Sequence, residues 1–289
     1  MGRLSLKSTS YLLRTGLLTC LVLTCGFARA QDTEDFEVWD SVSDDLGLIT
    51  DMEYQVEEPD EEELKVRLGI IGGLAPEYRG DDAYRIAYAP NLRIVWKDFL
   101  FIKGRKAGMK LFDNDTIYGG VFARYTGGRS EENDGLEGLG DISRTITSGA
   151  YLNFRYEALR LKTEIRHDFL NEGHGTLAIF ELGSRIPWDR PLFYMALTTT
   201  WADSENMRTF FGVNRLQSQR SGLRTYYPSA GLRDVSLALS TAYEFFPHWS
   251  VSAHLRYIHL LGDAADSPVV KDIGSRHGGI FGLGLNYTF

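Results

Sequence analysis

The stretch that decides the fold is the last twelve residues, Gly278-Gly-Ile-Phe-Gly-Leu-Gly-Leu-Asn-Tyr-Thr-Phe289. Side chains along a β-strand point alternately to opposite faces. One face of this stretch therefore carries the large apolar groups of positions 281, 283, 285, 287 and 289, and the other carries Gly282, Gly284, Asn286 and Thr288. A strand that is apolar on one side and small or polar on the other is typical of a transmembrane barrel with a polar lumen.

The same ending resembles the carboxy-terminal assembly signal of bacterial outer-membrane barrels. In that signal, a polar residue, a glycine and two late aromatic residues are spaced so that the aromatics face lipid. Gly284, Tyr287 and Phe289 match the pattern, whereas Gly282 stands where the polar residue is expected. The resemblance implies that Gly284, Tyr287 and Phe289 direct assembly into an outer membrane.

Other segments alternate in the same way, and the clearest is residues 159–166. Leu159, Leu161, Thr163 and Ile165 share one face, while the opposite face is fully charged. No stretch of 18 consecutive apolar residues follows Leu64, so no helix is predicted to cross a bilayer. Because only helices and closed barrels satisfy every backbone group in lipid, the sequence predicts an all-β, closed, antiparallel transmembrane β-barrel.

Twelve strands are predicted, at residues 64–75, 84–96, 98–103, 107–112, 116–126, 145–157, 158–168, 175–187, 190–202, 231–246, 248–261 and 278–289. If the Gly-interrupted residues 98–112 do not cross twice, the alternative is ten. An even number places both the N-terminus and the C-terminus in the periplasm and the long connections, 127–144, 203–230 and 262–277, outside. Trp96, Trp188, Trp201 and Trp249 fall at predicted strand ends, where an aromatic girdle is expected.

The amino-terminal 30 residues predict a secretory signal peptide. Basic residues precede an apolar run from Leu17 to Phe27, and Ala28-Arg-Ala30 fits a cleavage site. A lipoprotein signal is the alternative, with Cys25 as the lipidated residue, although Thr24 is a poor residue immediately before it. Both cysteines, Cys20 and Cys25, lie in the signal, so disulfide and thiolate chemistry are excluded from the mature chain.

Residues 31–63 form an acidic leader before the barrel, which is predicted over 64–289. Between residues 32 and 63 there are fifteen Asp or Glu and no Lys or Arg, and the whole chain has a net charge of −8, which argues against nucleic-acid binding. Such a run repels itself and cannot bury a core, so a solvated, disordered periplasmic leader is one interpretation. The other is a docking tail for a cationic partner or peptide, whose candidate residues are Glu57, Glu58, Asp60, Glu61, Glu62 and Glu63.

Charged residues on the predicted inner faces define a lumen charge network. Its members are Arg155, Arg160, Lys162, Glu164, Arg166, Glu181, Arg185, Glu244 and Arg256. Both signs are present, and a barrel of ten or twelve strands is of intermediate width. These side chains therefore either pair with one another and plug the barrel or line a narrow pore.

The sequence does not predict an enzyme, and no cofactor or metal is expected. His248 and Ser250 have the spacing of a His-x-Ser pair, but they fall at a periplasmic turn and face the lumen, with no third group to orient the base. The six histidines form no metal signature and are expected at the surface or in the girdle, with His254 and His259 on opposite strand faces. The acidic cluster of Glu131, Glu132, Asp134, Glu137 and Asp141 lacks EF-hand spacing, so a solvated loop is preferred to a Ca²⁺ site.

From about residue 64 to the end, the chain resembles the MipA/OmpV family. The resemblance rests on the order and spacing of several motifs: Leu68–Tyr84 with Pro90, Gly138-Leu-Gly-Asp141, Gly173-His-Gly175, Thr200-Trp-Ala-Asp203, Phe211-Gly-Val213, Gly222-Leu223, Ala230-Gly-Leu232 and Leu261–Val270. It implies an outer-membrane barrel in contact with membrane lipid. The member that gives the family its name is a scaffold joining a murein lytic transglycosylase to a penicillin-binding synthase, and others are linked to adhesion, osmotic response or cationic antibiotics. The leading hypothesis is therefore a non-catalytic scaffold or sensor. The alternatives are a small-solute channel of the outer membrane and an OmpV-like protein that acts in adhesion or responds to cationic antibiotics.

Overall fold

The computed structural model describes residues 64–170, 172–186 and 191–289. The predicted signal peptide, the acidic leader with its candidate docking residues, and Trp188 lie outside the described residues.

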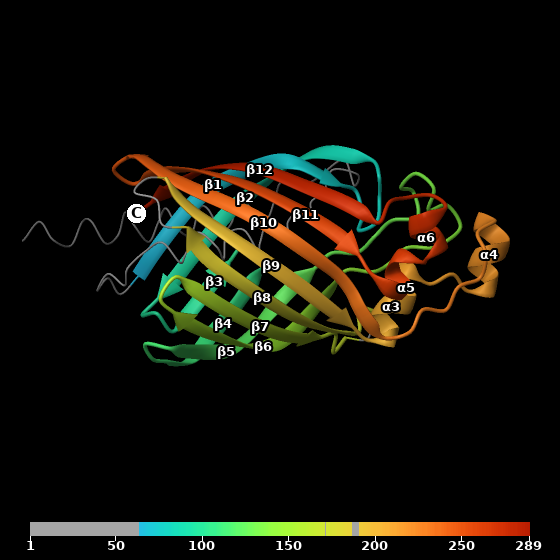
Figure 1. Cartoon of the computed structure of the whole chain (residues 1–289), viewed down its shortest axis with the longest axis horizontal. Helices are drawn as coiled ribbons and strands as arrows, with labels where there is room; N and C mark the ends of the chain where they lie inside the picture. Colours follow the sequence, from blue (N-terminus) through green and yellow to red (C-terminus); the bar gives the residue numbers. More distant parts are fainter. Residues whose placement is uncertain (1–63, 171, 187–190) are drawn as a thin grey trace, which may run out of the picture. The chain divides into compact units, whose positions relative to one another are not determined.

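The described chain forms a closed antiparallel barrel of twelve strands in which each strand pairs with its sequence neighbours and β1 pairs with β12 (Figure 1). The predicted fold class and the count of twelve are thus confirmed, and the alternative of ten is wrong. The strands are β1 (Leu64–Pro76), β2 (Tyr84–Trp96), β3 (Leu100–Lys103), β4 (Lys106–Asp113), β5 (Ile117–Thr126), β6 (Thr145–Tyr156), β7 (Leu159–His167), β8 (Thr176–Ile186), β9 (Leu192–Ala202), β10 (Gly231–Phe246), β11 (Trp249–Leu260) and β12 (His277–Thr288).

The segment that left the strand count open is a short hairpin. Strand β3 pairs with β2 only from Arg93 to Trp96, although β2 continues to Tyr84. Strand β4 nevertheless pairs along most of its length with β5, so the hairpin completes the wall with two strands. Its shortness is the reason that periodicity alone could not decide between ten and twelve.

The seam between the first and last strands closes the barrel. Strands β1 and β12 are paired from Arg67 opposite Thr288 to Leu74 opposite Phe281. The backbone N–H of Phe289 extends this pairing by donating to the Val66 carbonyl over 2.9 Å. A Cβ on Gly73 would stand 1.9 Å from the Phe281 carbonyl oxygen, so the close approach of the two strands requires glycine there.

The outer face of the wall is apolar and the inner face is polar, as the alternation predicted. Exposed aliphatic side chains occur on strands around the whole barrel, among them Ile70, Val121, Ile165, Leu197, Leu237 and Leu283. Trp96, Trp201 and Trp249 are also exposed, at strand ends. In the part of the chain that the structure describes, no helix is long and apolar enough to cross a membrane.

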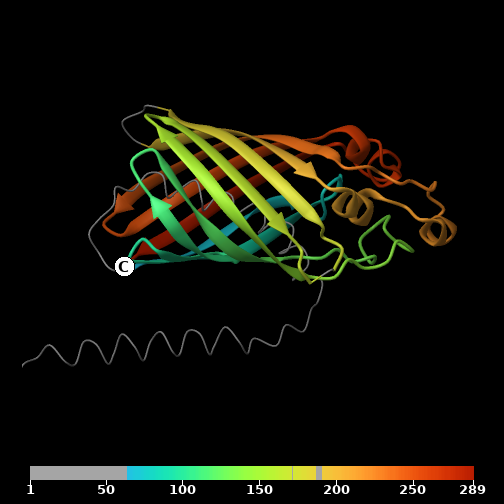
Figure 2. The ribbon, with the colours of Figure 1, turned by 90° about the horizontal axis from the view of Figure 1, so that it is seen from below.

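The two ends of the barrel differ. One end, which we call the turn end, holds the start of β1, the end of β12 and short turns such as Phe246–Trp249. The other, the loop end, carries the long connections, and Figures 1 and 2 show the helices at this end, opposite the C-terminus. The helices are α3 (Ser204–Phe211), α4 (Arg215–Ser221), α5 (Gly262–Ala265) and α6 (Pro268–Lys271).

The loop end is a packed cap, which the sequence analysis did not predict. Met207 and Phe211 of α3 are buried against Leu260, Ala264 and Val270. A second apolar cluster joins Tyr78, Leu136, Leu139, Val213 and Val269 from four separate connections. Because these segments bury apolar side chains against one another, they form a folded cover over the loop end of the lumen.

Candidate functional site: the charged lumen

Two buried ion pairs hold the middle of the lumen. Lys106 Nζ lies 2.6 Å from Glu164 Oε2, and Arg166 Nη1 lies 3.8 Å from Glu164 Oε1. Lys162 Nζ lies 3.0 Å from Glu181 Oε1, and Glu181 also accepts from the hydroxyl of Tyr194. Lys162, Glu164, Arg166 and Glu181 of the predicted network are therefore brought together on the inner faces of β7 and β8.

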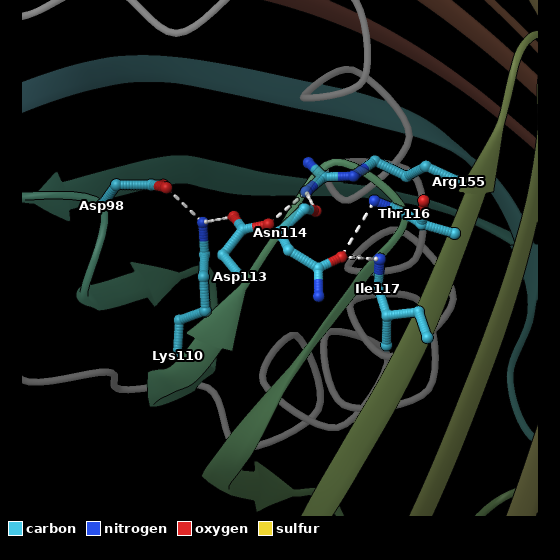
Figure 3. A network of polar contacts seen from close by, with 7 residues as sticks. All are labelled: Asp98, Lys110, Asp113, Asn114, Thr116, Ile117 and Arg155. Atoms are coloured by element: carbon cyan, nitrogen blue, oxygen red, sulfur yellow. Dashed lines mark hydrogen bonds and ion pairs between the residues drawn. The ribbon is translucent and has the colours of Figure 1, made fainter.

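Arg155 belongs to a different group at the turn end, shown in Figure 3. Its guanidinium pairs with Asp113 and donates to the Asn114 carbonyl over 2.8 Å. Lys110 lies 2.6 Å from the second oxygen of Asp113 and also pairs with Asp98. This turn-end cluster of Asp98, Lys110, Asp113 and Arg155 links the β2–β3 turn and β4 to β6.

The remaining predicted members lie at other positions along the barrel. Arg160 donates to the backbone carbonyls of Glu157 and Leu159 in its own turn. Arg185 lies at the turn-end half of β8, and Glu244 is exposed near the turn end of β10. Arg256 is buried in the loop-end half of the lumen. The nine residues thus occupy several separate places along the lumen rather than one network.

Several lumen charges were missed by the sequence analysis. Lys106 and Arg124 alternate with outward-facing Ala107 and Ala123, so the same alternation could have found them. Arg233 and Asp234 are consecutive and both buried, because the register of β10 against β9 shifts between Leu232 and Asp234. A β-bulge of this kind breaks strict alternation, and the sequence gives no signal for it.

Two cavities lie along the lumen of the described barrel. The larger, of about 150 Å³, lies in the loop-end half beneath the cap and is lined by Tyr78, Phe210 and Phe211 as well as by polar wall residues. The smaller, of about 100 Å³, lies in the turn-end half. Glu164 and Ile179 line both, so the Lys106–Glu164 ion pair stands at the boundary between them.

Beside the cap, Asp168 organises the β7–β8 connection. Its carboxylate accepts from Thr145 Oγ1 over 2.7 Å and from three backbone N–H groups, those of residues 170, 172 and 174. Burial by itself would raise the pKa of this carboxyl, but the hydrogen bonds outweigh it and hold the pKa below the usual 3.8. The side chain is therefore a fixed anion that ties the loop to β6.

The structure also locates the residues that the sequence analysis considered for a His-x-Ser pair and for a Ca²⁺ site. His248 lies in the β10–β11 turn with its ring against Tyr287, and Ser250 is the next residue but one, on β11. The carboxylates of Glu131 and Asp141 accept hydrogen bonds from backbone N–H groups of their own loop. Within the described residues, no group of three or more His, Cys, Asp or Glu is arranged to hold a metal ion.

The histidine prediction was partly wrong. His254 and His259 do lie on opposite faces, as expected, since His254 is buried in the lumen and His259 contacts His277 on the outside. His254 and His174 are buried, however, rather than at the surface. His174 Nε2 lies 2.7 Å from the Ser143 carbonyl, a contact between connections that sequence spacing does not reveal.

The residues of the proposed assembly signal lie along β12. The ring of Tyr287 stands 5.0 Å from that of Trp249 and 4.9 Å from that of Phe289, which makes an aromatic cluster at the turn end. Gly284 faces the lumen, where an added Cβ would come within 2.5 Å of Ser252 Oγ. Their role in assembly stays a prediction.

A closed antiparallel wall with an apolar outer face and a charged inner face defines a β-barrel of the outer-membrane class. The model of the family described as MltA-interacting protein MipA matches residues 68–289, and the chain belongs to this family. It is similar to MltA-interacting protein of Escherichia coli (strain K12) and of Shigella flexneri, at 30% identity over 162 residues, or 52% of this chain and 59% of each relative. The matched region thus spans less than two thirds of these relatives.

Solved structures share the barrel only loosely. The translocator domain of autotransporter NalP from Neisseria meningitidis is 12% identical and has a TM-score of 0.37, covering 86% of this chain and 96% of that one. The CymD monoaromatic hydrocarbon channel is 10% identical and has a TM-score of 0.36, covering 79% and 88%.

Proposed function

We propose that this protein is a non-catalytic scaffold or sensor of the Gram-negative outer membrane, with its N-terminus and C-terminus in the periplasm. The observation that carries the proposal is the filled lumen of the described barrel: the Lys106–Glu164 and Lys162–Glu181 ion pairs occupy its middle and a packed cap covers its loop end. A barrel filled in this way serves better as a rigid membrane anchor than as a passage. The relatives' name, MltA-interacting protein, supports a periplasmic murein hydrolase as the partner.

The turn end is the surface that we assign to such a partner. Its turn-end cluster is partly exposed, with an exposed fraction of 52% for the Asp98 side chain and 33% for that of Arg155. The acidic leader joins the barrel at Leu64, which is also at the turn end. In this proposal a basic periplasmic protein binds the turn-end cluster, and the acidic leader acts as a docking tail for it.

Binding of a purified murein lytic transglycosylase to the refolded barrel tests this proposal. The full mature chain should bind most strongly. A variant that lacks residues 31–63 and the variant Asp98→Asn should each bind more weakly. Exposed charges are screened beyond about 8 Å at physiological ionic strength, so high salt should mimic the deletion. Asp272→Asn, an exposed acid beside α6 at the loop end, is the matched control. Equal binding by all variants at both salt concentrations would contradict a turn-end docking surface.

The second candidate is a small-solute channel, which the two cavities along the lumen, both with charged residues in their walls, favour. Planar-bilayer conductance separates the two functions. The scaffold hypothesis expects a silent barrel, because the Lys106–Glu164 pair stands between the cavities. Steady openings of the unmodified protein would favour the channel.

A further inference from the structure

The loop-end cavity carries an excess of positive charge. The arginines that line it are Arg79, Arg124, Arg129, Arg166, Arg233, Arg256 and Arg276, whereas its acids are Glu77, Glu164 and Asp234. Each of these acids already has a cationic partner. Asp234 Oδ2 lies 2.7 Å from Arg233 Nε and 3.2 Å from Arg79 Nη1, and Glu77 pairs with Arg85.

The turn-end cavity shows that this excess is not a general property of the lumen. Its cations are Lys103, Lys106, Lys110 and Lys162, and its acids are Asp98, Glu164 and Glu181. Each acid there is matched by a lysine, in the pairs Lys110–Asp98, Lys106–Glu164 and Lys162–Glu181. The charges of the turn-end cavity are therefore nearly balanced, and the surplus of guanidinium groups is confined to the loop-end cavity.

Arg129 is the residue that most directly indicates a ligand. Its exposed fraction is 8%, its Nη1 donates to the Phe210 carbonyl over 2.9 Å, and its buried Nε has no hydrogen-bond partner. The guanidinium carbon also lies 5.8 Å from the centroid of the Tyr78 ring, within cation–π range. Burial lowers the pKa of Arg129 to about 10, so the side chain remains charged at neutral pH. Arg129 also lines the loop-end cavity, so an oxyanion there would accept charge-assisted hydrogen bonds from the part of the guanidinium that faces the cavity.

We propose that the loop-end cavity is a binding site for a small soluble oxyanion of the phosphate type, held by Arg129 and the arginines of the surrounding strands. Guanidinium groups recognise such anions through paired, charge-assisted hydrogen bonds. A cavity of about 150 Å³ has room for several water molecules or one small oxyanion. Its walls are the lumen and the cap rather than the lipid face, so the ligand enters as a solute and not as a lipid headgroup.

Calorimetric titration of the refolded full mature chain with inorganic phosphate, in a phosphate-free detergent, tests the site. Sodium chloride at matched ionic strength is the reference. Saturable binding of phosphate is expected, and Arg129→Gln should weaken it by about tenfold or more, as loss of one charged hydrogen-bond donor does. Arg215→Gln is the control, because it removes the same charge from the cap at an exposed position that does not line the cavity. It should bind phosphate as the unmodified chain does.

Arg129→Lys keeps the experiment decisive if Arg129→Gln does not give a heat-modifiable barrel. Lysine retains the charge but lacks the planar fork, so a folded Arg129→Lys barrel should bind phosphate more weakly than the unmodified protein. The proposal is overturned if phosphate gives no more heat than chloride does. It is equally overturned if a folded Arg129 variant binds phosphate with unchanged affinity.

Discussion

Replacing Leu237 with arginine should strongly destabilise the folded barrel in a membrane. Leu237 lies on the outer face of β10, opposite Tyr257 of β11 and Leu197, the central residue of β9. Its position near the middle of the wall places it at the level of the bilayer midplane. An arginine on the lipid face at that depth costs about 2 to 4 kcal/mol, which corresponds to roughly 30- to 1,000-fold in the folding equilibrium.

Leu216 provides a matched control. It lies on α4 in the cap, and its exposed fraction of 53% is close to the 48% of Leu237. If both side chains were exposed to water, the same substitution would have a small effect at either site. In a membrane barrel only Leu237 is exposed to hydrocarbon, so Leu216→Arg should change the free energy of unfolding by less than about 0.5 kcal/mol.

The assay is equilibrium unfolding of the barrel in lipid vesicles by denaturant, followed by tryptophan fluorescence and by heat-modifiable migration on gels. The expected result is a large loss of stability for Leu237→Arg and almost none for Leu216→Arg. Equal costs at the two positions, or no cost at either, would refute the assignment of this face to lipid. A refolding yield too low for equilibrium measurement in Leu237→Arg alone agrees with the assignment.

Three further substitutions test other parts of the molecule. Phe289→Ser should reduce the amount of heat-modifiable barrel in the outer membrane, whereas Phe246→Ser, at a turn-end aromatic of similar exposure (66% against 63%), should not; equal amounts of both would exclude a special role for the terminal residue. Glu164→Gln should cost about 3 to 5 kcal/mol in the same unfolding assay because it leaves Lys106 buried without its partner, while the double change of Lys106→Met with Glu164→Leu should cost much less. A single variant no less stable than the double one would contradict this. Asp168→Asn should destabilise the loop end by about 1 to 3 kcal/mol at neutral pH. Because the folded pKa of Asp168 is lowered, its contribution is fully present above the usual 3.8 and is lost as the pH falls below that value, so the difference between variant and unmodified protein should shrink in acid. Hydrogen exchange of the β7–β8 connection at several pH values measures this difference in local stability. A difference that does not depend on pH would argue against an ionised Asp168.

The alternation of side chains was sufficient to predict the barrel because strand geometry is local. Leu283 and Leu285 face outward and Gly284 and Asn286 inward in any strand that contains them, whatever the strand pairs with. A closed wall then follows from the absence of water in lipid, since an open edge would leave backbone groups unsatisfied. The count of twelve followed from the same pattern, except at the short β3–β4 hairpin, where four residues are too few to define a period.

The arrangement inside the barrel depends on which strands lie opposite one another across the lumen. Glu164 pairs with Lys106, 58 residues earlier in the chain, and only the closed wall brings β4 and β7 close enough for this contact. Arg155 shares a predicted face with other lumen residues, yet the length of its strand places it at the turn end beside Asp113. The sequence alone determined which residues face inward, and tertiary structure decided how they pair.

The cap and the arginine-lined cavity depend on the tertiary structure even more. The helices of the cap are short, and isolated helices of this length are not stable in water, so they form because Met207, Phe211 and Val270 bury apolar surface together. The surplus of guanidinium groups arises where Arg129 from a connection meets strand residues beneath that cap. Local periodicity, a property of neighbouring residues, determined the wall of this protein. Contacts between distant residues, which depend on closure of the barrel and on the β10 bulge, decided how its lumen and its cap are arranged.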